Sequence, residues 1–317
     1  MPAMRWCPKI TYSEFWYDSC GAGKIHGCRW EPDTQPRCII QVVHGIADHA
    51  YRYDDFAVYM AEKGFLVIAE DHMGHGKSGG DETVRGYFNG GWFAAVEDTF
   101  HLLLSVQNEY PNVPYILLGH SMGSFMSMTL LQKYTEHGLA GCILCGTGWQ
   151  PDTGVSAGIK LCDLICRKKG EKSPSPRLQA MLFGAYNLNI EHPRTDYDWV
   201  NRKNREVDKY LADPLCQDPV TAGLMRDLLI GIAYIQTPEN IARIQKDLPV
   251  MVIAGGDDPV GTYGHGTRKT VQELTESGMQ DVSLRIYPLC RHELLHEINK
   301  LEIYENISDW IERVINK

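Results

Sequence analysis

The amino-acid sequence predicts an α/β fold in which one mostly parallel β-sheet is flanked by helices. Three observations support this prediction. Short apolar runs alternate with helical patterns from residue 38 to residue 145. The runs are apolar at successive positions, which is typical of strands buried on both faces. The same alternation resumes after residue 248. Parallel strands joined by helices form one sheet through right-handed crossovers.

Length and composition limit the class of protein. A chain of 317 residues is long enough for one large α/β domain with an inserted subdomain. The net charge of -9, with no basic tract, argues against nucleic acid as a partner. No apolar run approaches the ~20 residues of a transmembrane helix, and residues 1–7 show no apolar core of a signal peptide. Ten cysteines are too few for a disulfide scaffold. We therefore expect a cytoplasmic protein.

In chain order, the first half of the sequence predicts a hairpin and then alternating strands and helices. The hairpin covers residues 11–17 and 24–30, where aromatic residues flank a glycine-rich turn. Apolar runs predict the later strands, and apolar residues at helical spacing predict the helices. These strands are expected at 38–43, 65–69, 115–118 and 141–145, and the helices at 52–63, 92–109 and 124–134.

The alternation stops between residues 149 and 243, where no clear strand appears and prolines interrupt the helical patterns. We expect residues 149–243 to form a helical cap, or lid, inserted after the sixth strand of a core made by residues 1–148 and 244–317. Within the cap, residues 223–235 are apolar on nearly every side, which predicts a helix buried between cap and sheet. The remaining elements are expected at 249–254 and 282–287 (strands) and at 267–276 and 294–316 (helices).

The segment Gly119-His120-Ser121-Met122-Gly123 joins a predicted strand to a predicted helix. A G-x-S-x-G sequence in this context is typical of a nucleophile elbow, a sharp turn that lifts the serine hydroxyl clear of the sheet. The glycines flank the serine because the turn brings neighbouring backbone close. The free N–H groups of the following helix then face the site. Ser121 is therefore the candidate nucleophile.

A serine nucleophile needs a base and an orienting acid, which follow it along the chain in the order acid then histidine. Loops at the carboxyl ends of the last two predicted strands supply both residue types. The first loop contains Asp257 and Asp258, and the residue pattern alone does not separate them. The second contains His292. Another candidate, His296, lies one turn into the predicted last helix, so position favours His292.

The motifs taken together resemble the monoacylglycerol lipase and lysophospholipase-like group of α/β-hydrolases. The resemblance rests on the elbow, His44-Gly45, the run 71–78, Asp258-Pro259-Val260 and Arg291-His292-Glu293, and it covers residues 38–317 apart from the cap. It implies the α/β-hydrolase fold. In that group the acid directly precedes the proline, which selects Asp258, and the histidine of the R-H-E stretch selects His292. Met73 stands where the group usually has arginine, in a structural loop outside the catalytic set.

An oxyanion hole requires two N–H donors aimed at the charge that develops during acyl transfer. One donor is expected from the residue after the nucleophile, Met122. The other is expected from the loop after the first parallel strand, where the His44-Gly45 pair indicates Ile46. Both residues are chosen for their backbone amides.

These residues predict a serine hydrolase that cleaves carboxylic esters of apolar or lipid-like acyl groups, of the monoacylglycerol or lysophospholipid type, through an acyl-enzyme on Ser121. No metal or cofactor is expected; the loop histidines (His44, His49, His72, His75 and His120) are interpreted as stabilising loops by hydrogen bonds. A peptidase or amidase, an acyltransferase with the same catalytic residues, and a non-catalytic ligand-binding protein are the alternatives. The apolar stripe at 159–166 allows transient contact with a membrane surface.

Overall fold

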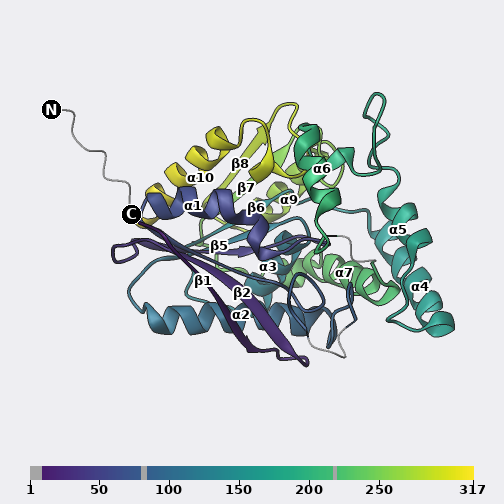
Figure 1. Ribbon diagram of the computed structural model, residues 1–317, viewed down its shortest axis with the longest axis horizontal. Coiled ribbons are helices and arrows are strands. Elements are labelled where there is room, and N and C mark those ends of the chain that lie inside the picture. Colours follow the sequence, from purple (N-terminus) through teal and green to yellow (C-terminus); the bar gives the residue numbers. More distant parts are fainter. Residues whose placement is uncertain (1–8, 80–83, 217–219) are drawn as a thin grey trace.

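A computed structural model of the chain describes residues 9–79, 84–216 and 220–317. One central sheet has helices on both faces, and further helices gather at one end of it (Figure 1). Residues 1–7, on which the expectation about a signal peptide rests, lie outside the described residues. Within the described ranges, every helix is too short or too polar to cross a bilayer.

The described residues form an eight-stranded sheet in the spatial order β1-β2-β4-β3-β5-β6-β7-β8. β1 and β2 form the predicted antiparallel hairpin, and β2 also pairs antiparallel with β4. Every pairing from β4 to β8 is parallel, so the prediction of a mostly parallel sheet is confirmed. The strands are β1 (Thr11–Asp18), β2 (Lys24–Glu31), β3 (Cys38–Val43), β4 (Phe65–Glu70), β5 (Tyr115–His120), β6 (Gly141–Cys145), β7 (Val250–Gly255) and β8 (Val282–Tyr287).

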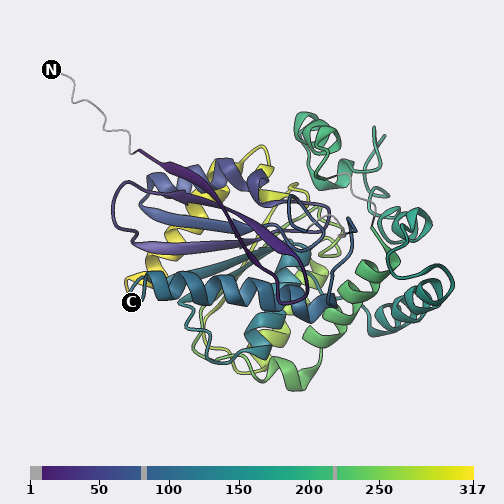
Figure 2. The same cartoon turned by 60° about the horizontal axis from the view of Figure 1, so that its bottom comes forward.

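Helices follow the strands, and five of the described α-helices lie between β6 and β7. The helices are α1 (Asp54–Glu62), α2 (Gly91–Glu109), α3 (Met122–Lys133), α4 (Asp152–Lys169), α5 (Pro176–Phe183), α6 (Asn204–Ala212), α7 (Ala222–Ile235), α8 (Pro238–Ile241), α9 (His265–Glu276) and α10 (Lys300–Ile315), with short 3-10 helices η1 (Ala50–Tyr53), η2 (Asp198–Val200) and η3 (Leu294–His296). Residues 152–241 are called the α4–α8 segment below. Figure 2 shows α4, α5 and α6 at the same end of the sheet.

The last helix begins later than the sequence predicts. The chain from residue 294 first forms η3, and Glu297 then adopts an extended conformation before α10 begins at Lys300. The Glu297 carboxylate accepts hydrogen bonds from the backbone N–H groups of Arg291 and Ile298. These contacts hold Glu297 outside a helix. His296 is consequently a half-buried residue of η3 rather than part of the last helix.

The two faces of the sheet bury separate hydrophobic clusters. In β3, Ile39 and Val43 enter the cluster covered by α2 and α3, whereas Ile40 and Val42 enter the cluster covered by α1 and α10. This alternation follows from the two-residue period of a strand. Because both faces are covered, every β3 residue is buried, as its largely apolar sequence predicts; the one polar side chain, Gln41, is hydrogen-bonded to the Thr99 carbonyl oxygen and to the Tyr115 hydroxyl.

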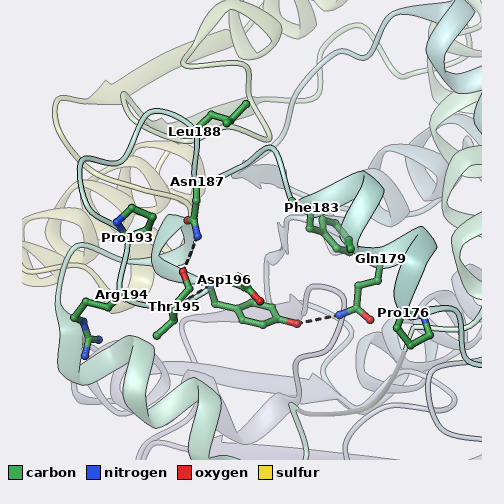
Figure 3. A pocket seen from close by; sticks show the side chains of 12 residues that line it. Pro176, Gln179, Phe183, Asn187, Leu188, Pro193, Arg194, Thr195 and Asp196 are labelled. Carbon is green, nitrogen blue, oxygen red and sulfur yellow. Dashed lines mark hydrogen bonds between the residues drawn. The ribbon is translucent and has the colours of Figure 1, made fainter.

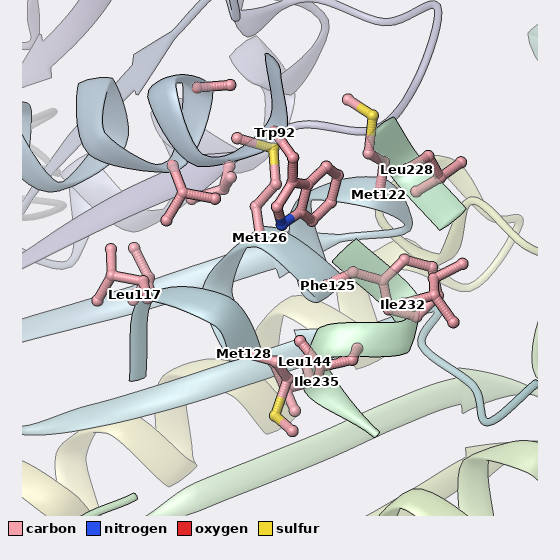
Figure 4. Packing of buried hydrophobic residues seen from close by; sticks show 14 of the residues in the cluster. Trp92, Leu117, Met122, Phe125, Met126, Met128, Leu144, Leu228, Ile232 and Ile235 are labelled. Atoms are coloured by element: carbon pink, nitrogen blue, oxygen red, sulfur yellow. The ribbon is translucent and has the colours of Figure 1, made fainter. Parts of the chain in front are cut away.

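Helix α7 connects the α4–α8 segment to the core. It packs against α2, α3 and α4, and its residues Leu228, Ile232 and Ile235 belong to the same hydrophobic cluster as Phe125 and Met128 of α3 (Figure 4). The prediction of a buried helix over residues 223–235 is therefore confirmed. Gly231 lies directly against the Trp92 ring, since a Cβ atom added there would be 2.1 Å from Trp92 Cε2. Close contact between α7 and α2 thus depends on the missing side chain.

We predict that Gly231→Ala destabilises the protein, although alanine usually stabilises a helix by up to ~1 kcal/mol relative to glycine. Overpacking against Trp92 costs about 1–3 kcal/mol and outweighs that gain. Urea denaturation followed by circular dichroism measures the change. The matched control is Gly154→Ala in α4, where an added Cβ meets open space; it should be neutral or stabilising. Equal effects at both positions would contradict the proposed packing constraint.

Candidate active site

Ser121 lies in a strained turn between β5 and α3, with φ 52° and ψ −121°. A positive φ is unfavourable for serine and persists only where packing imposes it. Here the packing leaves no room for side chains on either flank. A Cβ atom added to Gly123 would lie 1.9 Å from the Val43 carbonyl oxygen, and one added to Gly119 would lie 2.3 Å from the Gly123 carbonyl oxygen. The turn therefore has the elbow geometry that the sequence predicts.

The loops after β7 and β8 bring Asp258 and His292 together. His292 Nδ1 lies 2.9 Å from Asp258 Oδ2, and both side chains are buried. The other oxygen, Asp258 Oδ1, accepts the Val260 N–H at 2.9 Å. Asp257 is exposed instead. With Nδ1 directed to the carboxylate, Nε2 of His292 is the nitrogen that remains for a reacting group.

A small cavity of about 40 Å³, called the central cavity, joins the candidate residues. Ser121, His120, His292 and Ile46 all contribute to its wall. Gly146, with φ 62°, lets the chain after β6 pass close to the rings of His120 and His292, because a Cβ there would lie 3.0 Å from His292 Cε1. The central cavity has room for about one water molecule.

Two backbone N–H groups, one on each side of Ser121 in the site, have no acceptor among the described residues: Ile46 lines the central cavity, and Met122 directly follows Ser121. Within residues 9–79, 84–216 and 220–317, the amides of Ile46 and Met122 donate to no protein acceptor. The loop that carries Ile46 passes close to the nucleophile, since a Cβ added to Gly45 would lie 3.2 Å from Ser121 Cβ. Met122 is the first residue of α3, where the helix dipole adds positive potential. The site can therefore offer two donors to an anion beside Ser121.

An apolar cavity of about 300 Å³ also begins at Ser121. Helix α7 contributes Met225, Leu228, Leu229 and Ile232 to its wall. A third and larger cavity, the outer groove of about 660 Å³, lies among α5 and residues 187–197 (Figure 3). Phe183 lines all three cavities. The aromatic ring of Phe183 is thus at the junction between the outer groove, the nucleophile and the apolar cavity.

Sequence reasoning missed a buried arginine next to these residues. Arg52 donates to both Glu293 carboxylate oxygens, at 2.7 and 2.9 Å, and to Asp48 Oδ1 at 2.9 Å. Glu293 follows His292, and Asp48 belongs to the loop that carries Ile46. Burial raises the pKa of Glu293, but the Arg52 guanidinium outweighs it and lowers that pKa. The four-residue spacing of Asp48 and Arg52 was visible in the sequence, whereas the contact with Glu293 was not.

The α4–α8 segment also supports the loop that carries His292. The backbone N–H groups of His292 and Glu293 donate to the carbonyl oxygens of Trp199 (3.4 Å) and Val200 (2.8 Å). Arg291 donates to the carbonyl oxygens of Asp198 and Asn201. Residues 198–201 are therefore attached to the histidine loop through main-chain contacts.

Several histidines stabilise the loops, as the sequence predicts. His44 Nδ1 donates to the Gly45 carbonyl oxygen at 2.7 Å, and His44 Nε2 accepts the His72 N–H at 2.9 Å. Burial lowers the pKa of His44 and lowers that of His75 to about 4. The His120 ring lies 4.8 Å from the His292 ring; burial, together with the proximity of His292, lowers the pKa of His120 to about 3. The rings of His44, His75 and His120 are therefore neutral at physiological pH.

Comparisons with known proteins give a consistent family. Residues 34–299 match the family described as "Serine aminopeptidase, S33". The chain is 30% identical to a monoacylglycerol lipase from Mycolicibacterium smegmatis, covering 95% of this chain and 97% of that one. It is 29% identical to the monoglyceride lipase of Rattus norvegicus, with 91% and 87% covered. A solved carboxyl esterase from Bacillus coagulans superposes with a TM-score of 0.89 at 29% identity, covering 97% of this chain and all of the other.

We predict that Arg52→Met costs about 3–5 kcal/mol of stability at pH 7, because it leaves two buried carboxylates without their cation. The sign of the pH dependence provides the sharper test. With Arg52 present, the lowered pKa values of Asp48 and Glu293 stabilise the fold above their ordinary pKa values, and this stabilisation is lost as pH falls. Without Arg52, burial raises both pKa values, so the variant loses stability as pH rises.

Urea denaturation at pH 7 and at about pH 4 measures this difference between the variant and the unmodified protein. The cost of Arg52→Met should be smaller at the lower pH. Arg52→Lys keeps the positive charge but not the bidentate contact with Glu293, so its stability should lie between that of the unmodified protein and that of Arg52→Met. A cost that is the same at both pH values would contradict the assignment of Arg52 as the counter-ion of both carboxylates.

Proposed function

This chain belongs to the serine aminopeptidase S33 family and has the α/β-hydrolase fold, and from that membership we propose that it hydrolyses carboxylic esters of apolar acyl groups. The observation that carries the proposal is the apolar cavity that begins at Ser121. An acyl chain lying in that cavity would have its carbonyl carbon beside the serine. The names of the similar proteins, two lipases of monoacylglycerols and a carboxyl esterase, agree with an ester substrate.

In the proposed acylation step, His292 Nε2 takes the proton of Ser121 Oγ while the oxygen attacks the ester carbonyl carbon. Asp258 holds the His292 ring through Nδ1 and stabilises its positive form. The amides of Ile46 and Met122 bind the negative oxygen of the tetrahedral intermediate. His292 then returns the proton to the leaving alcohol, and the acyl group remains on Ser121.

Deacylation repeats these steps with water as the nucleophile. The central cavity, with room for about one water molecule beside Ser121 and His292, suits this step. His292 removes a proton from the water, and the hydroxide attacks the acyl-enzyme carbonyl. His292 then returns that proton to Ser121 Oγ, which leaves with the release of a carboxylic acid. None of these steps draws on a cofactor.

The substrate class follows from the two unequal spaces near Ser121. The apolar cavity suits a fatty acyl chain, whereas the outer groove has a mixed wall that includes polar side chains such as Asn187, Thr195 and Asp196. We propose a single-chain lipid ester, a monoacylglycerol or a lysophospholipid, with its polar part toward the groove. A peptidase remains the second candidate because the matching family carries an aminopeptidase description. A peptide amide tested beside the esters separates the two.

We further propose that residues 149–243 are a cap over a core made of residues 1–148 and 244–317. Support comes from the position of the α4–α8 segment between β6 and β7 and from its share of all three cavity walls. In α4, Cys162 and Cys166 are buried and the helix packs on α7, but Leu164 is exposed. Met181 and Leu188 are exposed as well. These side chains support transient contact with a lipid surface.

A cytoplasmic location is also part of the proposal. It is supported by the described cysteines, which are all free thiols and mostly buried. Free thiols are typical of proteins in reducing compartments.

The first prediction from this proposal concerns Ser121 and its partners. A fluorophosphonate probe should label the intact protein, and Ser121→Ala should abolish the label. Asp258→Asn should lower kcat for a nitrophenyl ester by about 10⁴-fold. Asp257→Asn is the matched control, since Asp257 is exposed, and it should retain most of the activity. Labelling that survives Ser121→Ala, or equal losses at the two aspartates, would contradict the catalytic assignment.

The second prediction concerns acyl-chain length. Leu228→Trp places a larger side chain in the wall of the apolar cavity. It should lower kcat/KM for palmitate and decanoate esters by at least about tenfold. Each methylene group that no longer fits the cavity costs about 1–3 kcal/mol of binding free energy, and about 1.4 kcal/mol corresponds to a tenfold change. Turnover of the acetate ester should persist, which also controls for folding. Equal loss at every chain length would show that this cavity does not bind the acyl group.

A further inference from the structure

A second cluster of reactive side chains lies outside the candidate active site. His49, Asp213 and Cys216 each offer one ligand atom, and the three atoms lie within 4.8 Å of one another. His49 follows β3, whereas Asp213 and Cys216 follow α6. The His49 and Cys216 side chains are buried, and the Asp213 carboxylate is partly exposed. Residues more than 160 positions apart therefore converge on one point between the core and the α4–α8 segment.

The donor types fit a particular class of metal ion. An imidazole nitrogen, a carboxylate oxygen and a thiolate sulfur are the ligands that Zn²⁺ takes in proteins, whereas Ca²⁺ and Mg²⁺ prefer oxygen alone. In a tetrahedral zinc site, neighbouring ligand atoms lie about 3.3–3.8 Å apart. His49 Nε2 and Asp213 Oδ2 are 2.9 Å apart. Movements of up to about 1 Å would place all three atoms around one ion.

A hydrogen bond within the turn after α6 orients the Asp213 carboxylate toward His49. Asp213 Oδ1 accepts the Leu215 N–H at 2.9 Å, so the carboxylate is held with Oδ2 toward His49. Beside the cluster lies a cavity of about 270 Å³ whose wall includes His49, Leu215 and Tyr51. Of the three side chains, His49 lines this space, so a hydrated ion can approach the cluster from the His49 side. It also leaves room for a water molecule as the fourth ligand.

We propose that His49, Asp213 and Cys216 bind Zn²⁺, which ties the turn after α6 to the loop after β3. Binding replaces the hydrogen bond from His49 Nε2 to Asp213 Oδ2 by two metal–ligand bonds. The proton on His49 Nε2 moves through solvent to Nδ1, so that the neutral imidazole binds zinc through Nε2. It also breaks the Cys216 S–H bond, forms a zinc–sulfur bond and releases the proton to solvent. The site is separate from the proposed hydrolytic chemistry, in which zinc takes no part. Its test therefore measures metal binding and stability rather than ester cleavage.

The experiment must first remove a competing surface cluster. Cys20, Glu97 and His101 also have ligand atoms within 4.8 Å of one another, but this group is largely exposed. The test protein therefore carries Cys20→Ser and His101→Ala. It is titrated with Co²⁺, a spectroscopic substitute for Zn²⁺, in the presence of a reductant without thiols. We expect one bound equivalent, a sulfur-to-cobalt charge-transfer band, displacement of cobalt by Zn²⁺ and a higher Tm with zinc.

Two further variants assign the ligands. Cys216→Ser should abolish the charge-transfer band and weaken binding at least about tenfold, since even outer contacts of a metal site change affinity by 10–100-fold. Asp213→Asn, a conservative change at a partly exposed side chain, should weaken binding similarly but keep the band. Absence of saturable binding in the double variant would overturn the proposal. Persistence of the band in a folded Cys216→Ser protein would overturn it equally, because the sulfur ligand would then lie elsewhere.

Discussion

The close approach between the turn at Ser121 and the end of β3 is the constraint on which the candidate site depends. Gly123 lies so close to the Val43 carbonyl oxygen that no side chain fits between them, and Ser121 has a positive φ as a result. The same approach places the loop after β3, with the free amide of Ile46, against the serine. Because parallel strands end at one edge of the sheet, the loops after β7 and β8 add Asp258 and His292 at that edge.

A buried charge network then fixes these loops relative to one another. Arg52 links Asp48, in the loop after β3, to Glu293, the neighbour of His292, and its guanidinium lies 5.0 Å from the Tyr210 ring centroid in α6. Main-chain hydrogen bonds from the histidine loop to residues 199–200 add a second attachment. Residues 199–210 of the α4–α8 segment are thereby attached to the core. At the end of α5, Phe183 lines all three cavities, so its ring lies where the outer groove meets the space around Ser121.

Local sequence signals predicted most of the sheet, because apolar runs report burial on both faces; β3, β6 and β8 have the bounds that were expected. The elbow was predictable because Gly119 and Gly123 stand where the neighbouring backbone leaves no room for a side chain. Asp257 and Asp258 were separable only by resemblance, since their difference in burial depends on packing with distant elements. Other features depend on contacts that the sequence could not indicate. The later start of α10 follows from the hydrogen bond between the Glu297 carboxylate and the Arg291 N–H. The role of Arg52 follows from its contact with Glu293, 241 positions away. The contact of His49 with Asp213, 164 positions away, is of the same kind.

The central claim is that Ser121 carries an acyl group during turnover. Rapid acid quenching of the protein with a long-chain nitrophenyl ester, followed by peptide mass spectrometry, tests this claim most directly. The account predicts a burst of about one equivalent of nitrophenol per protein molecule and an acyl group on the peptide that contains Ser121. Turnover without a burst and without an acylated peptide, or acylation of a different residue, would contradict it.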